Sequence, residues 1–328
     1  MPIRQLVLIA LLVAATPIPA VAQADTAATA LPVVCPDSLS AGGLKVCQAA
    51  LDGATMLHPF AALLMNGGNP RLGSAAPIGK FGHFAVTLRA TTATGVIPDL
   101  TYDGSTDTVA VGQRVQFYAP HVDLALGLVQ MVMPMGTIGV DAMFSALVIP
   151  SDRTTAFTPV PGSRTIGKAA VTLDWGVRFG MTSPTLPTVS LTIMKRSTPT
   201  VQLGGTTDGN TTAYTFNASS IDVRLFAGKR FDWLDLAAGA GVDLLSGTGE
   251  VAYRDPGTDV VGAPLEPKLS GMRIVTALNL GVHLGPLEFV AEGGYQVGSN
   301  LALTTRFAEV NPNTGKFFGG FGVVLSRE

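Results

Sequence analysis

The sequence predicts an all-β fold, an antiparallel transmembrane β-barrel of about ten strands (within a range of ten to fourteen) with a short helical N-terminal segment. Three observations predict it. Charged residues make up only 13% of the 328 residues, about half the ~25% share typical of soluble domains. From residue 81 onward, segments in which every second residue is apolar dominate, and this is the period of a strand. The connections between these segments alternate strictly between short and long.

The first 22 residues have the features of a signal peptide. Arg4 supplies a positive charge, an apolar core "LVLIALLVAA" follows, and "AVAQA" offers small-x-small cleavage sites. The alternative is an uncleaved membrane anchor. Pro17 and Pro19 break the apolar run, which is shorter than the ~20 residues that a spanning helix needs. We therefore expect an exported chain from which residues 1–22 are cleaved.

Two cysteines follow in the exported part of the chain. Cys35 and Cys47 flank "PDSLSAGGLKV", and in an oxidising compartment two such cysteines pair. The alternative is two unrelated thiols. The sequence predicts a structural Cys35–Cys47 disulfide without redox chemistry.

The segment 23–80 differs from everything after it. Its apolar residues have helical spacing, as at Leu44, Cys47 and Leu51, and "NGGNPRLG" supplies a stop signal of Asn, Gly and Pro. We expect one or two short helices here. The sequence thus divides into a periplasmic or plug segment over 23–80 and a barrel over 81–328.

Ten period-2 segments follow, and many exceed the ~5–6 residues usual for soluble strands. They fit the ~9–11 residues that cross a bilayer at a tilt. In the segment 171–179 the alternate apolar residues would scatter around a helix but share one face of a strand. The segments are 81–92, 113–130, 137–149, 167–180, 186–195, 215–228, 234–245, 270–284, 287–297 and 316–325.

The lengths of the connections predict on which side of the membrane each of them lies. Short ones cover 131–136, 181–185, 229–233 and 285–286, and long ones cover 92–112, 150–166, 196–214, 246–269 and 298–315. Outer-membrane barrels have short periplasmic turns and long extracellular loops. Because the first connection is long and the last strand ends the barrel, both barrel ends fall on the short-turn side. We expect the disulfide-bearing segment in the periplasm or up inside the barrel.

The two faces of the strands differ in charge. One face carries rows of apolar residues without a charge, and the opposite face carries glycines and isolated charges. A soluble β-sandwich is the alternative, but its loops have no reason to alternate in length. If the apolar face meets lipid, the charges face the lumen. These predicted lumen-facing residues are Arg89, His121, Asp123, Asp141, Asp174, Arg178, Asp222, Arg224, Asp235, Asp243, Arg273, His283, Glu288 and Glu292.

Two interpretations of these charges stay open. Acidic residues outnumber arginines about two to one among them. They fill the barrel as an internal ion-pair network, with Asp174–Arg178 and Asp222–Arg224 as pairs, or they line a narrow, mildly cation-preferring pathway. Ten strands are fewer than the 16–18 of open porins, so a plug formed by 24–80 fits either interpretation.

The combination of signal peptide, alternating strands and closing apolar strand resembles the Gram-negative outer-membrane β-barrel class over residues 81–325. In that class the barrel-insertion machinery reads the last strand, here "FFGGFGVVL" with Gly320, Val323 and Leu325; this chain departs by ending in "SRE" without an aromatic residue. The resemblance implies outer-membrane lipid and that machinery as partners. A helical segment before the barrel is similar to the plug of FadL-type transporters, which have fourteen strands.

The expected function is a passive channel or small-solute transporter, with hydrophobic compounds as one substrate class. The alternative is a structural or surface-interaction barrel with a closed lumen that binds through its long loops. An enzyme similar to the ten-stranded omptin proteases is third: it needs two polar pairs near the rim, and only His121 and Asp123 suggest one. We therefore expect no catalytic activity.

Other function classes lack their signals. The sequence has no GxxxxGK[ST], GxSxG or HExxH motif, and its four histidines are dispersed, so we expect no cofactor and no metal. A formal charge of −2 lacks the basic face that nucleic acid requires.

Overall fold

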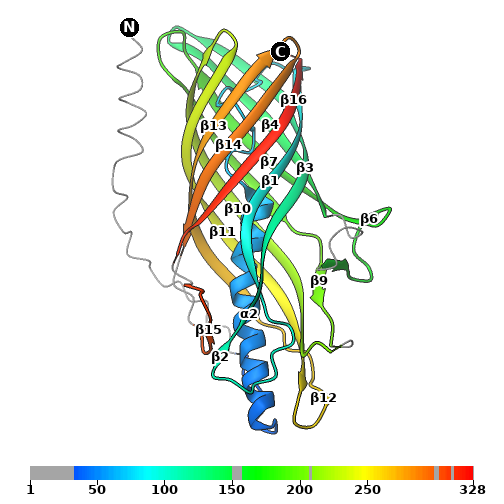
Figure 1. Cartoon of the computed structure of the whole chain (residues 1–328). Coiled ribbons are helices and arrows are strands. Elements are labelled where there is room, and N and C mark those ends of the chain that lie inside the picture. The colour runs from blue at the N-terminus through cyan, green and yellow to red at the C-terminus, as the bar shows by residue number, and fades with distance from the viewer. Residues whose placement is uncertain (1–32, 150–156, 207–208, 299–302, 312–313, 328) are drawn as a thin grey trace. The chain divides into compact units, whose positions relative to one another are not determined.

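Ten long strands form one closed antiparallel ring in the computed structural model (Figure 1). The structure describes residues 33–149, 157–206, 209–298, 303–311 and 314–327; the predicted signal peptide, 1–22, lies outside them. The strands are β1 (Phe84–Pro98), β3 (Val111–Met133), β4 (Gly136–Ile149), β7 (Ala169–Thr182), β8 (Thr188–Ser197), β10 (Thr212–Phe231), β11 (Leu234–Asp255), β13 (Lys268–Leu284), β14 (Leu287–Gly298) and β16 (Lys316–Arg327).

Each long strand pairs with the next one along the chain, and β16 pairs with β1 to close the ring. The predicted all-β antiparallel barrel is therefore confirmed. Closure leaves no unpaired sheet edge among these ten strands, which is the condition for a sheet in lipid.

Short strands lie in the long connections. They are β2 (Thr108–Val109), β5 (Phe157–Pro159), β6 (Thr165–Ile166), β9 (Val201–Gly204), β12 (Val260–Val261) and β15 (Arg306–Phe307). The hairpin of β10 and β11 also extends further toward the long loops than predicted, with Thr212 opposite Tyr253. The prediction stopped at Leu245 because Gly247 and Gly249 interrupt the apolar alternation, whereas backbone pairing continues past them.

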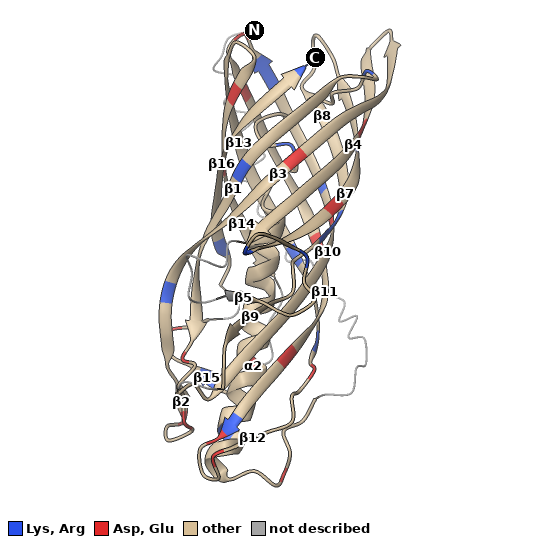
Figure 2. Cartoon of the chain, turned by 90° about the vertical axis from the view of Figure 1, so that its right-hand side faces the viewer, with Lys and Arg blue, Asp and Glu red and all other residues tan. Residues whose placement is uncertain are grey.

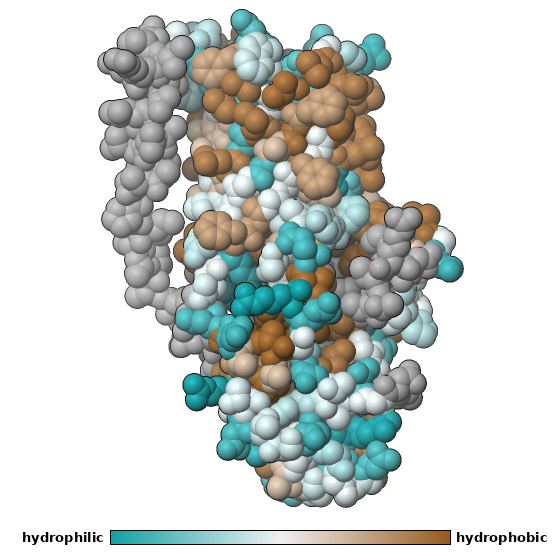
Figure 3. All heavy atoms as spheres, viewed as in Figure 1, coloured by the Kyte–Doolittle hydropathy of each residue, from teal (hydrophilic) through white to brown (hydrophobic). Residues whose placement is uncertain are grey.

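The outer surface of the barrel wall is apolar. Leu88, Leu173 and Trp175 are 59%, 65% and 62% exposed, although each lies within a paired strand. Figure 3 shows the result on one face: apolar side chains gather over the part toward the short turns, and polar side chains over the long-loop end. Exposed apolar patches of this extent in a soluble monomer are unusual.

One helix, α2 (Ala41–Asn66), lies inside the ring of strands (Figure 1). The Ser40 side chain accepts a hydrogen bond from the Gly43 N–H at its start, and Gly67 ends it with a φ of 58°. The helix packs chiefly against β10 and β11. Among the described residues, no helix is long and apolar enough to cross a membrane.

The helix is a single element where the sequence predicted one or two short ones. Pro59 lies inside it without ending it. An internal proline costs about 3 kcal/mol in an isolated helix. Here the flanking side chains of Leu57, Phe60 and Leu63 are buried in one core with Phe117 and Phe216 of the wall, and this packing holds the helix together. The predicted Cys35–Cys47 disulfide is present and fastens the residues before the helix to its second turn.

Candidate functional site

The structure places the fourteen charged residues that the sequence assigned to the lumen on the inner side of the wall. All of them are buried except His283, whose side chain is 22% exposed. Figure 2 shows that charged positions are spread over the strands of the barrel and do not gather in one patch. The lumen therefore contains many separate polar contacts.

The ion pairs join different partners from those predicted. Asp222 pairs with Arg196 (Oδ2–Nε 2.9 Å), and Arg224 pairs with Asp243. Asp174 accepts from the backbone N–H of Ser197 (2.8 Å). The predicted ion pairs Asp174–Arg178 and Asp222–Arg224 are therefore not the ones that form. The pairs that do form are diagonal across neighbouring strands, since Arg196 lies opposite Ser220 and Arg224 lies opposite Gly241.

Arg196 is a luminal charge that the sequence interpretation missed. Its side chain is buried, with 1% of the residue exposed. Its Nη1 donates to the carbonyl oxygen of Met65, 3.4 Å away at the end of α2. The predicted strand stopped at Lys195. Extending the inward row of Ser190, Thr192 and Met194 by one more step of two would have placed Arg196 in the lumen.

The chain after α2 continues through the lumen toward the short turns. We call the described residues 33–80 the plug. Two wall carboxylates hold its second half by its backbone: Glu292 accepts from the N–H groups of Gly68 (3.0 Å) and Asn69 (2.9 Å). Asp141 accepts from those of Ile78 (2.9 Å) and Gly79 (2.7 Å). Each carboxylate thus satisfies two buried donors of a segment that has no secondary structure to satisfy them.

Glycines on the wall make room for this part of the plug. A Cβ at Gly180 would lie 2.8 Å from the Pro77 ring, and one at Gly127 would lie 2.4 Å from the Lys80 carbonyl oxygen. Larger residues at these inward positions would push the plug away from the wall. Gly127, Gly139 and Gly180 therefore accommodate the part of the plug at residues 77–80.

The plug is also fastened at the long-loop end. Asp255, at the outer tip of β11 beyond the apolar band, accepts from the backbone N–H of Ser40 (2.9 Å) and from its hydroxyl. These bonds hold the pKa of Asp255 at about 2, below its ordinary value. Asp52 of α2 accepts from the N–H of Thr304 (3.1 Å) in the last long loop. Carboxylate bonds therefore hold the plug at both ends.

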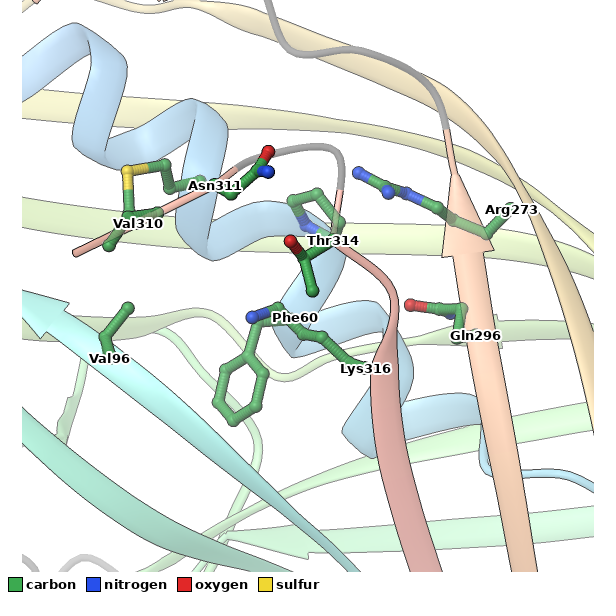
Figure 4. Close-up of a pocket in the computed structure, with 10 residues that line it drawn as sticks. Phe60, Val96, Arg273, Gln296, Val310, Asn311, Thr314 and Lys316 are labelled. Atoms are coloured by element: carbon green, nitrogen blue, oxygen red, sulfur yellow. The ribbon is translucent and has the colours of Figure 1, made fainter. Parts of the chain in front are cut away.

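A small pocket opens between α2 and the wall near the long loops (Figure 4). Its volume is about 40 Å³. Arg273 of β13 and Lys316 of β16 reach into it from strands on either side of β14, and Phe60 of α2 lies beside them. The lining residues are Met56, Pro59, Phe60, Val96, Arg273, Gln296, Val310, Asn311, Thr314 and Lys316.

A second polar cluster lies near the short turns. One carboxylate oxygen each of Asp235 and Glu288 and one imidazole nitrogen of His283 lie within 4.8 Å of one another, close enough to be considered as ligands of a metal ion. His283 Nε2 is 3.1 Å from Asp235 Oδ2. Arg230 also bonds this carboxylate, with Nη2 3.0 Å from Oδ2, so Asp235 is already paired with a cation of the chain. This arrangement suits a structural charge network better than a metal site.

The two residues that suggested a protease site lie away from the rim. His121 is 2% exposed, and its Nε2 is 3.2 Å from the Leu64 carbonyl of α2. Asp123 is 4% exposed and forms an ion pair with Arg89 (Oδ2–Nε 2.5 Å). Both residues are therefore buried in this conformation, and α2 contacts His121.

Comparisons with known proteins add little to this picture. The chain matches no protein-family model and no curated protein. Solved structures similar to it include the outer membrane protease OmpT of Escherichia coli, at 14% identity over 79% of this chain and 100% of that one, with a TM-score of 0.38. Another is the translocator domain of the autotransporter NalP of Neisseria meningitidis, at 11% identity over 85% and 96%, with a TM-score of 0.34.

A FadL homologue of Pseudomonas aeruginosa is also similar, at 10% identity over 90% of this chain and 99% of that one, with a TM-score of 0.28. The fold of this chain is defined by its own strands. The closed ring of ten antiparallel strands, the apolar exterior and the polar, plugged lumen together make this chain a β-barrel of the outer-membrane type.

Proposed function

We propose that the protein lies in the outer membrane of a Gram-negative bacterium and provides a passage for small solutes, which its plug closes in the conformation described. The apolar exterior supports contact with lipid. The alternation of short and long connections supports short turns in the periplasm and long loops outside. In this proposal the barrel-insertion machinery of that membrane assembles the protein.

A polar belt on the inner wall carries the proposal. It consists of Arg89, Thr91, His121, Asp123, Ser145 and Asp174, on the consecutive strands β1, β3, β4 and β7. Each has a buried side-chain nitrogen or oxygen that hydrogen-bonds to no protein atom among the described residues. Buried polar atoms are satisfied by protein or by ordered water. The belt therefore supports ordered water along β1, β3, β4 and β7, next to the part of α2 that contacts β1 and β3.

The two halves of the plug are held differently, which indicates which half moves. The helix α2 is packed by apolar side chains against the wall. The segment 67–80 buries few large apolar side chains, chiefly Leu72 and Ile78, and is held by hydrogen bonds to its backbone. Glu292 and Asp141 accept four of these bonds, and Asn279, Arg178 and Arg224 make others. We therefore place opening in a shift of 67–80 while α2 stays docked.

Planar-bilayer conductance of the full refolded chain tests this proposal. The double variant Glu292→Gln/Asp141→Asn removes both carboxylates that hold 67–80, and we expect it to show channel openings that the unchanged protein rarely shows. The matched control is Glu309→Gln/Asp107→Asn, which removes two exposed carboxylates from the long-loop end.

A reversible lock distinguishes plug movement from a leaky wall. A Cβ at Gly180 lies 3.1 Å from the Pro77 Cβ, slightly under the ~3.5–4.5 Å of a disulfide, so Pro77→Cys/Gly180→Cys can join plug to wall. We add these two cysteines to the Glu292→Gln/Asp141→Asn variant. We expect no channel openings while the new disulfide is oxidised and openings again after it is reduced. The Glu292→Gln/Asp141→Asn variant without the added cysteines is the control, because reduction also opens its Cys35–Cys47 disulfide. Absence of openings in the released, unlocked protein would overturn the passage.

A closed barrel that binds partners through its loops is the second candidate function. One observation favours it: the long-loop end has its own core, in which Tyr102, Val109, Tyr253 and Phe307 pack around the Cys35–Cys47 disulfide. An ordered outer surface of this kind suits recognition. If no variant shows channel openings in planar bilayers although its barrel is correctly folded, the result favours this function.

A further inference from the structure

We propose that the pocket between α2, β13 and β16 binds a small oxyanion, a carboxylate or a phosphate, through Arg273 and Lys316. The proposal is independent of whether the lumen conducts. It rests on the charges around the pocket, on their lack of partners and on the size of the space.

Two cations share the pocket without an acid of their own. Arg273 is 8% exposed, and its buried Nε has no hydrogen-bond partner among the described residues. Lys316 is half-buried on β16, and neither side chain forms an ion pair within the described part of the chain. A buried and a half-buried cation that share one space without an ion-pair partner are costly, so the site favours an anion.

The nearest carboxylate is already engaged. Asp243 lies opposite Arg273 on β11 and attracts it, but Arg224 bonds its Oδ1, and Gln296 Nε2 donates to its Oδ2 at 3.2 Å. His58 of α2 is the other titratable group that Arg273 affects, and it adds no negative charge. Asp243 therefore compensates the positive charge that faces the pocket only in part, because Arg224 shares it.

The shape of the pocket limits the ligand. A volume of about 40 Å³ holds more than the ~10–15 Å³ needed for one water and is far below the size of a lipid site. Met56 and Phe60 form an apolar side, and Gln296 and Thr314 add polar groups. A guanidinium and an ammonium that converge on such a space suit the oxygens of one small oxyanion.

Binding of ¹³C-acetate and of inorganic phosphate to the full refolded chain in detergent, followed by NMR line broadening at constant ionic strength, tests the site. Acetamide has the shape of acetate without its charge. We expect at least one of the two oxyanions to bind and acetamide not to bind. Arg273→Gln and Lys316→Gln should each weaken binding about tenfold or more, as expected for a lost charge-assisted bond.

Arg114→Gln is the matched control, because it removes an exposed cation from the same end of the barrel. We expect it to leave binding unchanged. Heat-modifiable migration on gels confirms that each variant is folded. A stronger effect of phosphate than of acetate identifies phosphate as the source, and the reverse identifies a carboxylate. Equal binding to Arg273→Gln and the unchanged protein, or equal binding of acetamide, would overturn the site.

Discussion

The hold of Glu292 on the plug can be tested by one change, Glu292→Gln. The carboxylate accepts from the N–H groups of Gly68 (3.0 Å) and Asn69 (2.9 Å), and the residue is 7% exposed. Glutamine keeps one acceptor oxygen and turns an NH₂ group toward the other donor. One charge-assisted hydrogen bond is lost, worth about 1.5–3 kcal/mol. The undocked population of 67–80 should therefore rise about 10- to 150-fold.

Cysteine accessibility measures that population. Ala75→Cys places a thiol at a position that is 3% exposed inside the lumen, and the described native cysteines are joined to each other. Its rate of labelling by a maleimide follows the fraction of molecules in which 67–80 is undocked. We expect the rate to rise at least about tenfold in Glu292→Gln and to stay unchanged in the exposed control Glu309→Gln. A rate that rises in Asp141→Asn but not in Glu292→Gln would refute the reasoning about Glu292.

Three further predictions concern the lipid face, the helix and the outer tip. Leu278→Lys, on the exterior of the barrel, should destabilise the protein folded in liposomes by about 2–4 kcal/mol. Val260→Lys, exposed in a long loop, should change this stability little. Equal effects of the two substitutions in a refolding titration would contradict the lipid contact. Gly53→Ala should lower the thermal midpoint although alanine favours helices, because its Cβ would lie 2.4 Å from the Tyr214 hydroxyl, and Tyr214→Phe should restore part of it. Because the folded pKa of Asp255 is lowered to about 2, its stabilisation is complete above the ordinary pKa of ~3.9 and is lost as the pH falls through 2. The midpoint difference between the unchanged protein and Asp255→Asn should therefore be constant from pH 7 to 5 and close toward pH 2, and a difference that persists at pH 2 contradicts the Ser40 contact.

Much of the barrel could be predicted because each strand carries its own evidence. Val171, Leu173 and Trp175 alternate with Thr172 and Asp174 over a length that spans a bilayer, and this local pattern needs no knowledge of neighbours. The ring then follows from short turns, since consecutive strands joined by a few residues pair with each other.

The partners inside the lumen could not be predicted in this way. Whether Asp222 meets Arg196 or Arg224 depends on the register between β8 and β10, which a single sequence does not show. The bonds of Glu292 and Asp141 go to backbone N–H groups of the plug, and a backbone donor leaves no trace in the residue types. The interior of the barrel therefore depends on contacts between distant residues.

The direction of α2 has a consequence for the order of assembly. The helix begins beside Asp255 at the long-loop end, and β1 begins at Phe84 on the short-turn side, so the plug traverses the lumen before the first strand starts. The seam between β1 and β16 consists of residue pairs from Phe84↔Arg327 to Ala93↔Phe318. Once this seam is hydrogen-bonded, a chain bearing a disulfide-closed loop would have to be pushed lengthwise through a filled ring. Joining β1 to β16 around an already placed plug avoids that step, so we expect this seam to close after the plug has entered the ring.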